Sequence, residues 1–204
     1  KHQLSETKLT TLEREILGFH RVGDIPGAEI PERYFNYLDT GEGELLACIV
    51  EHNLHDVLAM VALLGVVDSV VRTPDSSVDA RVQLAVAQLQ LRLKDSDSAM
   101  RFVEAVCSSK TDAPWKWEAL VLGATILRRQ SAFEASEKLL SRAVGLSGLS
   151  DQDQAPAHLM LAKLYEHKLR HYDKALEHAR LSFGAESESA SKRRLFRIST
   201  KSNA

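Results

Sequence analysis

The chain has 204 residues, of which 44% are hydrophobic and 26% charged, so it can bury a core as one or two domains, and wholesale disorder is excluded. Its two cysteines, Cys48 and Cys107, form no Cys-x-x-Cys pair, which argues against a disulfide scaffold or a cysteine zinc site and favours a reducing, cytoplasmic setting. The net charge of -2 divides unevenly, because residues 1–72 hold 6 Lys and Arg against 12 Asp and Glu, whereas residues 73–204 hold 20 against 16. This asymmetry predicts two units with different roles.

The first unit, residues 1–72, is predicted to consist of helices joined by irregular segments. An apolar stripe indicates a first helix that ends at Gly18, and a long helix follows over about 44–71. The most apolar stretch of that helix, 57–71, contains Asp68 and is shorter than the roughly 20 residues that a membrane helix needs. We therefore expect a buried helix and no membrane partner.

The second unit, residues 73–188, follows a linker at about 68–79 and shows an internal repeat. Small residues recur at Ala87, Gly123 and Ala162, with spacings of 36 and 39, and would let paired helices approach closely. Three helical hairpins are predicted, over 78–108, 115–144 and 155–183.

The third hairpin contains Ala-Lys-Leu-Tyr at 162–165, followed by Tyr-Asp-Lys-Ala-Leu at 172–176. This order of small and aromatic residues resembles tetratricopeptide repeats, in which such residues mark the contacts between helices. The first two hairpins have Val or Leu where that family usually has aromatic residues. The predicted fold class is therefore all-α, with the second unit a short tetratricopeptide-like α-solenoid of about three hairpins.

Basic residues recur where the first helix of each hairpin ends, and they are candidates for contacts with a nucleic-acid backbone. These residues are Arg92, Lys94, Arg128, Arg129, Lys168 and Arg170. The competing interpretation, favoured by their position, is that cations stabilise helix C-termini. Residues 189–204 form a further basic segment, which is predicted as either a final helix or a flexible arm, with the helix favoured.

Three histidines, His167, His171 and His178, have a spacing that could bring metal ligands together. A predicted turn before Tyr172 interrupts this stripe. Solvent-facing histidines are therefore favoured over a zinc site.

Two polar residues interrupt an apolar stripe on the long helix of the first unit. The stripe consists of Leu45, Ile49, His52, Asp56, Met60 and Leu63, which lie three or four positions apart and share one face. One interpretation is a hydrogen-bonded pair, with His52 bound to Asp56 one turn later. The other is a carboxylate that binds a divalent cation beside a general base.

Five short sequence motifs occur in a characteristic order along the first unit. They are Leu-Thr-Thr-Leu-Glu at 9–13, Leu-Gly-Phe at 17–19, Asp-Ile-Pro-Gly at 24–27, Pro31 with Tyr34 and Phe35, and Glu-His-Asn-Leu-His-Asp-Val at 51–57. In this order they resemble the C-terminal part of the YprB-like ribonuclease-H-like exonucleases of the DEDD superfamily, over roughly residues 4–70. Some members of that family carry helical repeats after the nuclease.

The resemblance implies a metal-dependent 3′–5′ exonuclease that acts on DNA or RNA with two Mg²⁺ or Mn²⁺ ions. By resemblance, Asp56 is the last metal-binding carboxylate and His52 occupies the general-base position. The family's first motif, Asp-x-Glu on a strand, has no counterpart in residues 1–72. One carboxylate cannot assemble a two-metal site, so we expect this chain alone to be inactive and to supply only the C-terminal helices of a nuclease domain.

Two further interpretations concern partners. Without a sheet to cover it, the 45–63 face of the long helix should associate with a second copy or pack against the repeats. The competing functional hypothesis is a non-catalytic tetratricopeptide-type adaptor, whose repeats bind a protein or peptide partner.

Overall fold

The computed structural model describes residues 6, 8–75 and 77–202, and within these ranges the chain forms helices and loops without a β-strand. The predicted all-α class is confirmed for this part of the chain. The chain divides into two compact units, Lys1–Thr73 and Pro74–Ala204. Each unit has its own internal contacts.

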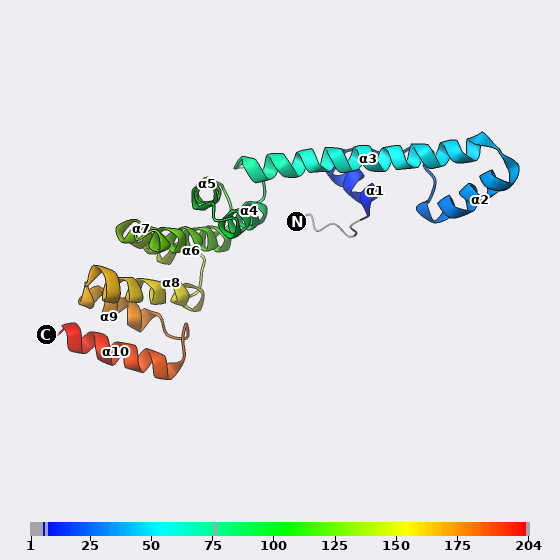
Figure 1. Ribbon diagram of the computed structural model, residues 1–204. Coiled ribbons are helices and arrows are strands. Elements are labelled where there is room, and N and C mark those ends of the chain that lie inside the picture. Colours follow the sequence, from blue (N-terminus) through cyan, green and yellow to red (C-terminus); the bar gives the residue numbers. More distant parts are fainter. Residues whose placement is uncertain (1–5, 7, 76, 203–204) are drawn as a thin grey trace. The chain divides into compact units, whose positions relative to one another are not determined.

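The first unit consists of short helical segments that contact one long helix (Figure 1). Its elements are α1 (Leu9–Leu12), the π-helix η1 (Glu13–Leu17), the 3-10 helix η2 (Gly27–Glu29), α2 (Ile30–Thr40) and α3 (Gly43–Arg72). The first helical segment ends at Gly18, whose φ of +65° lies in the left-handed region that glycine adopts without strain. Because η1 and α2 both contact α3, the irregular segment between them is also held near this helix.

The long helix α3 is largely exposed, so the prediction of a buried helix over 57–71 is wrong for the chain as described. Only Ile49 and Ala59 of α3 are buried. The physical reason is that α3 is apolar around its whole circumference, whereas η1 and α2 cover it on one side only.

The 45–63 face of α3, which was predicted to lack a partner, is mostly covered by other residues of the first unit. Ile49 is buried there, His52 and Asp56 are partly buried, and Met60 alone among the six predicted stripe residues is classed as exposed. A different apolar stripe on the opposite side is more than half exposed at every position. It consists of Val50, Leu54, Val57, Leu58, Val61 and Leu64.

By length and composition, α3 could cross a membrane, because the helix has 30 residues and its most apolar stretch of 18 residues has a mean hydropathy of 1.9. Only 6% of that stretch is buried. The expectation that 57–71 is too short therefore does not hold for the helix as a whole. This is weak evidence for a membrane span, since a core helix of a larger fold meets the same criterion. The absence of a membrane partner stays a prediction.

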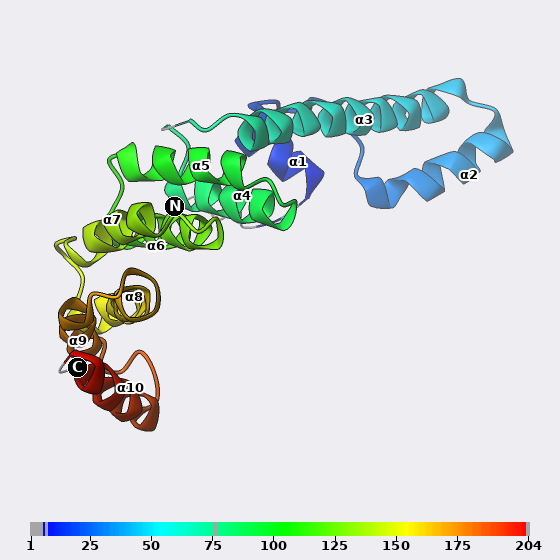
Figure 2. The same ribbon diagram turned by 60° about the vertical axis from the view of Figure 1, so that its left-hand side comes forward.

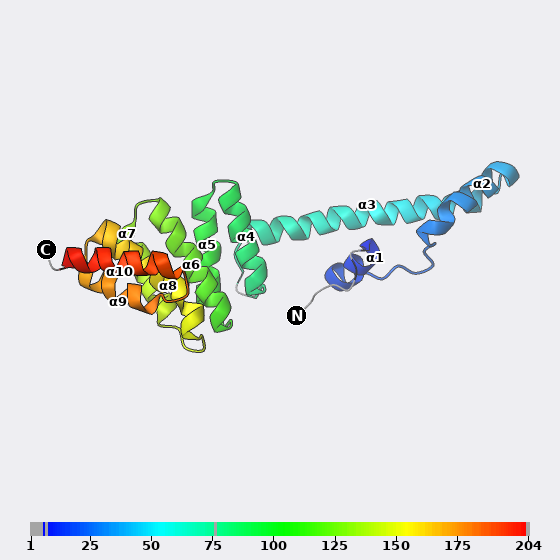
Figure 3. The same ribbon diagram turned by 90° about the horizontal axis from the view of Figure 1, so that it is seen from below.

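The second unit is a stack of three helix pairs followed by a final helix (Figures 2 and 3). The pairs are α4 (Ala80–Arg92) with α5 (Ser96–Ser108), α6 (Ala113–Arg129) with α7 (Phe133–Val144), and α8 (Asp151–Leu164) with α9 (Tyr172–Leu181). The π-helix η3 (Tyr165–Leu169) extends α8, and α10 (Glu188–Ser202) packs on α9. Successive pairs are joined by contacts of α5 with α6 and of α7 with α8.

Small residues allow the helices to approach where the repeat pattern predicts it. Ala87 and Ala162 are fully buried. A Cβ atom added at Gly123 would lie 2.9 Å from Leu139 Cδ1 and 3.0 Å from Val103 Cγ1. Because α6 lies close to α5 and α7 here, the Leu139 or Val103 side chain would have to shift to admit a methyl group at this position.

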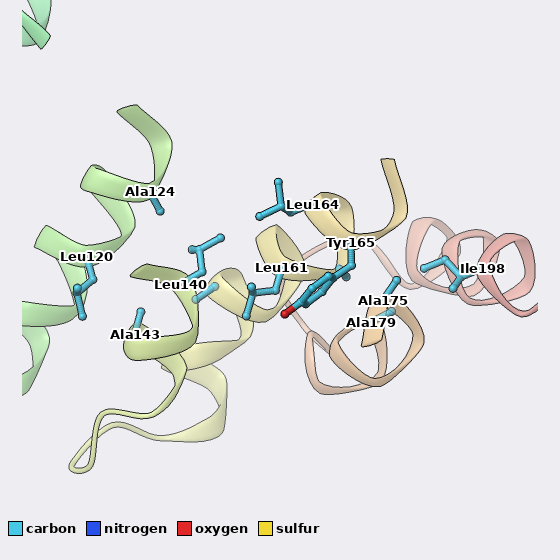
Figure 4. Packing of buried hydrophobic residues seen from close by; sticks show 12 residues of the cluster. Leu120, Ala124, Leu140, Ala143, Leu161, Leu164, Tyr165, Ala175, Ala179 and Ile198 are labelled. Carbon is cyan, nitrogen blue, oxygen red and sulfur yellow. The ribbon is translucent and has the colours of Figure 1, made fainter. Parts of the chain in front are cut away.

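One hydrophobic cluster extends through the last five α-helices, α6 to α10 (Figure 4). Each helix contributes at least one side chain that is at most 2% exposed. These side chains include Leu120 on α6, Leu140 on α7, Leu161 on α8, Ala175 on α9 and Ile198 on α10. The final helix is therefore part of the same core as the helix pairs.

The segment predicted as a basic tail is the helix α10 rather than a flexible arm. It buries Ile198, and it directs two of its cations, Arg197 and Lys201, to the carboxylate of Glu166 on η3. Its basic residues are thus partly committed to contacts within the second unit.

Candidate active site

Arg21 binds three carboxylates of the first unit. Its side chain is 5% exposed, and its Nε and Nη2 atoms both donate to Glu13, which is 1% exposed. Nη1 donates to Asp24 Oδ2 at 2.9 Å, and Nη2 donates to Asp56 Oδ1 at 2.6 Å. A single guanidinium thereby ties η1, the irregular segment after Gly18, and α3 together.

His52 lies between two of these carboxylates. Its Nδ1 atom is 2.8 Å from Asp24 Oδ1, and its Nε2 atom is 3.6 Å from Asp56 Oδ2. The predicted hydrogen bond between His52 and Asp56 is therefore a looser contact, and the closer partner of the imidazole is Asp24. The fold provides this partner from 28 positions earlier in the sequence.

The charges in this cluster support one another. Burial raises the pKa of Asp24, but hydrogen bonds from His52 and Arg21 outweigh it and hold that pKa below its ordinary value. Hydrogen bonds to Glu13, Asp56 and Asp24 raise the pKa of the Arg21 guanidinium, and burial lowers it. The hydrogen bonds outweigh the burial, so this pKa lies above its ordinary value. Asp24 is therefore ionised and Arg21 cationic at neutral pH.

The described residues do not form a metal site by themselves. No group of three or more His, Cys, Asp or Glu side chains with metal-binding geometry occurs among them. Asp56 is 35% exposed, but one of its two oxygens is bound by Arg21. The donor set among the described residues is thus too small for a two-ion centre.

The six basic candidates of the second unit are all exposed, and none forms an ion pair within the described part of the chain. They lie where α4, α6 and η3 end, as predicted. They are Arg92, Lys94, Arg128, Arg129, Lys168 and Arg170. The Nζ atom of Lys168 lies 5.1 Å from the ring centroid of Phe133 in the preceding pair, which places the turns of neighbouring pairs side by side.

The histidines considered for zinc do not meet. His178 is half-buried and pairs with His158, with 2.9 Å between their Nδ1 atoms, and its ring stacks on Tyr165. His167 and His171 are exposed. Within the described ranges these side chains form no metal-binding group, and only His167 and His171 face solvent as predicted, whereas His178 is partly enclosed.

Glu13, Arg21 and Asp24 were not predicted as site residues. Glu13 and Asp24 fall within two of the five sequence motifs, but the local sequence does not show that both side chains bind Arg21 beside α3. The acidic residues within these family motifs could have pointed to the cluster, since a carboxylate that becomes buried needs a cation partner. Arg21 is the cation nearest to Asp24 in the sequence, whereas Arg14 is nearest to Glu13, so the sequence alone does not show which cation binds both.

Comparison with known proteins bears on the first unit most directly. Residues 1–67 match a family model described as RNase_H superfamily. The first unit is thus similar to members of that superfamily. This supports the predicted ribonuclease-H-like relationship, while the DEDD exonuclease class is a finer statement that the match does not contain.

A curated relative covers most of the chain. The uncharacterized protein YprB of Bacillus subtilis (strain 168) is 27% identical over 185 residues, which are 89% of this chain and 43% of YprB. The chain therefore spans less than half of the length of this relative. No solved structure matches the chain.

Proposed function

We propose that this chain is the C-terminal part of a metal-dependent 3′–5′ exonuclease that acts on DNA or RNA. Asp56 would provide one carboxylate for Mg²⁺ or Mn²⁺, and His52 would be the general base. The observation that carries the proposal is that His52 and Asp56 meet within the stretch similar to the RNase_H superfamily, with Asp56 partly exposed. Exposure is needed for a group that must contact ions and substrate.

The rest of the proposed nuclease domain would complete the site. The chain covers less than half of YprB, and the described residues lack a set of metal ligands. We expect the missing carboxylates in the remainder of the domain, which would also cover the exposed stripe at Val50, Leu54 and Val61. The chain alone is expected to be inactive, and the exposed stripe rather than the 45–63 face would drive its self-association.

The second unit would contact the nucleic acid through its row of exposed basic turns. Six cations without internal ion pairs can approach phosphates without first breaking a salt bridge. Replacing Arg128 and Arg129 by Gln should weaken binding at low salt and reduce the salt dependence, whereas Lys192→Gln should change it less because Lys192 pairs with Glu188. Binding measured by fluorescence anisotropy at several salt concentrations tests this.

The second candidate function is a non-catalytic adaptor of the tetratricopeptide type. The observation that favours it is a hollow between α8 and α9 with exposed apolar residues at its rim. It is lined in part by His158, Arg180, Leu181 and Phe183, and Leu181 and Phe183 are 51% and 76% exposed. Such a surface would suit a peptide with an apolar anchor.

An activity assay separates the two candidates. A longer polypeptide that contains this chain and the YprB-like remainder is incubated with 3′-labelled DNA or RNA and Mg²⁺ or Mn²⁺. We expect degradation from the 3′ end, which Asp56→Asn lowers at least about 100-fold, since even residues that only support metal ligands contribute about 10–100-fold. Asp68→Asn is the matched control, because Asp68 lies on the same helix and forms an exposed ion pair with Arg72.

Full activity of the Asp56→Asn variant would show that the site is assigned wrongly. Absence of nuclease activity in the unaltered longer protein, together with binding of a peptide to the second unit, would favour the adaptor.

A further inference from the structure

Asp24 and His52 form a hydrogen bond between two segments that neither helix periodicity nor sequence proximity brings together. The distance from His52 Nδ1 to Asp24 Oδ1 is 2.8 Å, and the side chains of His52 and Asp24 are only 13% and 15% exposed. Asp24 is itself fixed, since its Oδ1 also accepts the backbone N–H of Ile25 and its Oδ2 accepts Arg21. The imidazole therefore contacts a carboxylate that has little freedom to turn away.

The chemistry of this bond determines which nitrogen carries the proton. An ionised carboxylate can only accept hydrogen bonds, so Nδ1 of His52 must be the donor. In the neutral imidazole, Nε2 then holds the lone pair. That nitrogen is the one 3.6 Å from Asp56 Oδ2, and it is the only ring nitrogen left to accept a proton.

Arg21 sets the position of both carboxylates relative to the ring. Its Nη1 atom holds Asp24 and its Nη2 atom holds Asp56, while two further N–H groups bind Glu13. With the guanidinium bound on three sides and 5% exposed, it is poorly placed to bind a substrate phosphate. Its contacts instead keep Asp24 and Asp56 at a constant separation around His52.

We propose that Asp24 is a positioning residue for His52: it holds the Nδ1–H tautomer and directs the basic Nε2 toward Asp56. The role rests on the proposed nuclease function, in which Nε2 would take the proton of the attacking water. The imidazolium formed would then lie against a carboxylate that stabilises its charge. Carboxylates that orient a catalytic imidazole in this way occur on unrelated folds.

The first measurement needs only the 204-residue chain and no activity. Nitrogen NMR of ¹⁵N-histidine-labelled protein is recorded at about pH 8.5, well above the ordinary imidazole pKa, and His52 is assigned with His52→Gln. We expect His52 with Nδ1 protonated and Nε2 unprotonated. Asp24→Ala should shift the mixture toward Nε2–H, whereas Asp24→Asn, whose amide oxygen still accepts, should retain Nδ1–H.

Asp39→Ala is the matched control, because Asp39 is an exposed acid of the same unit on α2. It should leave the His52 tautomer unchanged. An Nε2–H tautomer in the unaltered chain would overturn the proposal, and this result does not depend on the folding of any variant. An Asp24→Ala spectrum that still shows Nδ1–H at His52 would overturn it as well.

The second measurement separates positioning from catalysis itself. In the longer, active polypeptide, Asp24→Ala should lower kcat about 10–100-fold with KM within about twofold, and Asp24→Asn should recover part of the loss. A loss of kcat without a change of tautomer would mark Asp24 as merely structural and refute the role. If the unaltered longer protein has no nuclease activity, the proposed function fails, and the NMR result alone then reports on the Asp24–His52 geometry.

Discussion

Replacing Glu166 by Gln should destabilise the second unit measurably. The Glu166 side chain is fully buried on η3 and receives Arg197 Nε at 2.5 Å, Arg197 Nη2 at 2.7 Å and Lys201 Nζ at 3.0 Å. Burial raises the pKa of this carboxyl, but the hydrogen bonds from Arg197 and Lys201 outweigh it and lower the pKa from 4.5 to about 2. The ionised form is therefore favoured by folding.

The magnitude follows from the two pKa values. A fall from 4.5 to about 2 corresponds to about 3 kcal/mol of unfolding free energy when the carboxyl is ionised in both states. Arg197 and Lys201 are 45% and 39% exposed, so water screens them, and we reduce the expected loss to about 2 kcal/mol. Because the folded pKa lies below the unfolded one, this stability is complete well above pH 4.5 and is lost as the pH falls from 4.5 through about 2.

Urea unfolding at pH 7 and pH 2 tests this reasoning. The chain's two tryptophans, Trp115 and Trp117, both lie on α6, so their fluorescence reports on the second unit. Glu166→Gln should lower the unfolding free energy by about 2 kcal/mol at pH 7 and by much less at pH 2. Glu188→Gln, which removes an exposed pair with Lys192 on α10, is the control and should cost under about 0.5 kcal/mol. If Glu166→Gln did not lower the unfolding free energy at pH 7, or lowered it equally at both pH values, Arg197 and Lys201 would not stabilise an ionised Glu166.

Three further substitutions test the packing of the two units. Arg21→Met leaves Glu13 buried without a cation, so it should destabilise the first unit by about 3–5 kcal/mol, seen as lost amide protection in hydrogen exchange. Gly123→Ala should cost about 1 kcal/mol in urea unfolding, because the clash with Leu139 exceeds the gain in helix propensity, and Leu139→Ala should relieve it in a double-mutant cycle. Ser136→Ala removes a buried hydrogen bond to a carbonyl of α6 and should cost about 1 kcal/mol in the same assay.

Each of these has a matched control in the chain. Arg14→Met removes an exposed pair with Glu15 and should be nearly neutral. Gly65→Ala adds a Cβ with nothing within 4 Å and should stabilise α3 slightly. Ser199→Ala removes an exposed hydrogen bond to the carbonyl of Phe196 and should cost little. Equal effects of a test variant and its control would contradict the packing argument for that site.

The helices of the second unit could be predicted because their signals are local. The pair α6 and α7 begins and ends within two residues of the predicted hairpin over 115–144, since apolar periodicity and turn residues lie within each helix. The third pair begins earlier than predicted, at Asp151, because Ser150 and Asp153 form a capping box in a stretch that its polar composition marks as a turn.

The polar cluster of the first unit could be predicted only in part. His52 and Asp56 share a helix face by spacing alone, whereas Arg21 and Asp24 belong to a Pro- and Gly-rich segment without periodicity. Their partners on α3 lie 35 and 28 positions away, so only the folded chain shows the contacts. The exposure of α3 was also missed, because an apolar helix predicts burial without specifying what covers it.

The contacts of α10 also restrict how the chain can be shortened. A polypeptide that stops at Ser187 would keep all three helix pairs but would lose Arg197 and Lys201, the cations that donate to the enclosed carboxylate of Glu166. The same cut would remove Ile198 and open the end of the core to water. A designer who adds or deletes helix pairs in this stack should therefore keep α9 and α10 together as one C-terminal capping unit.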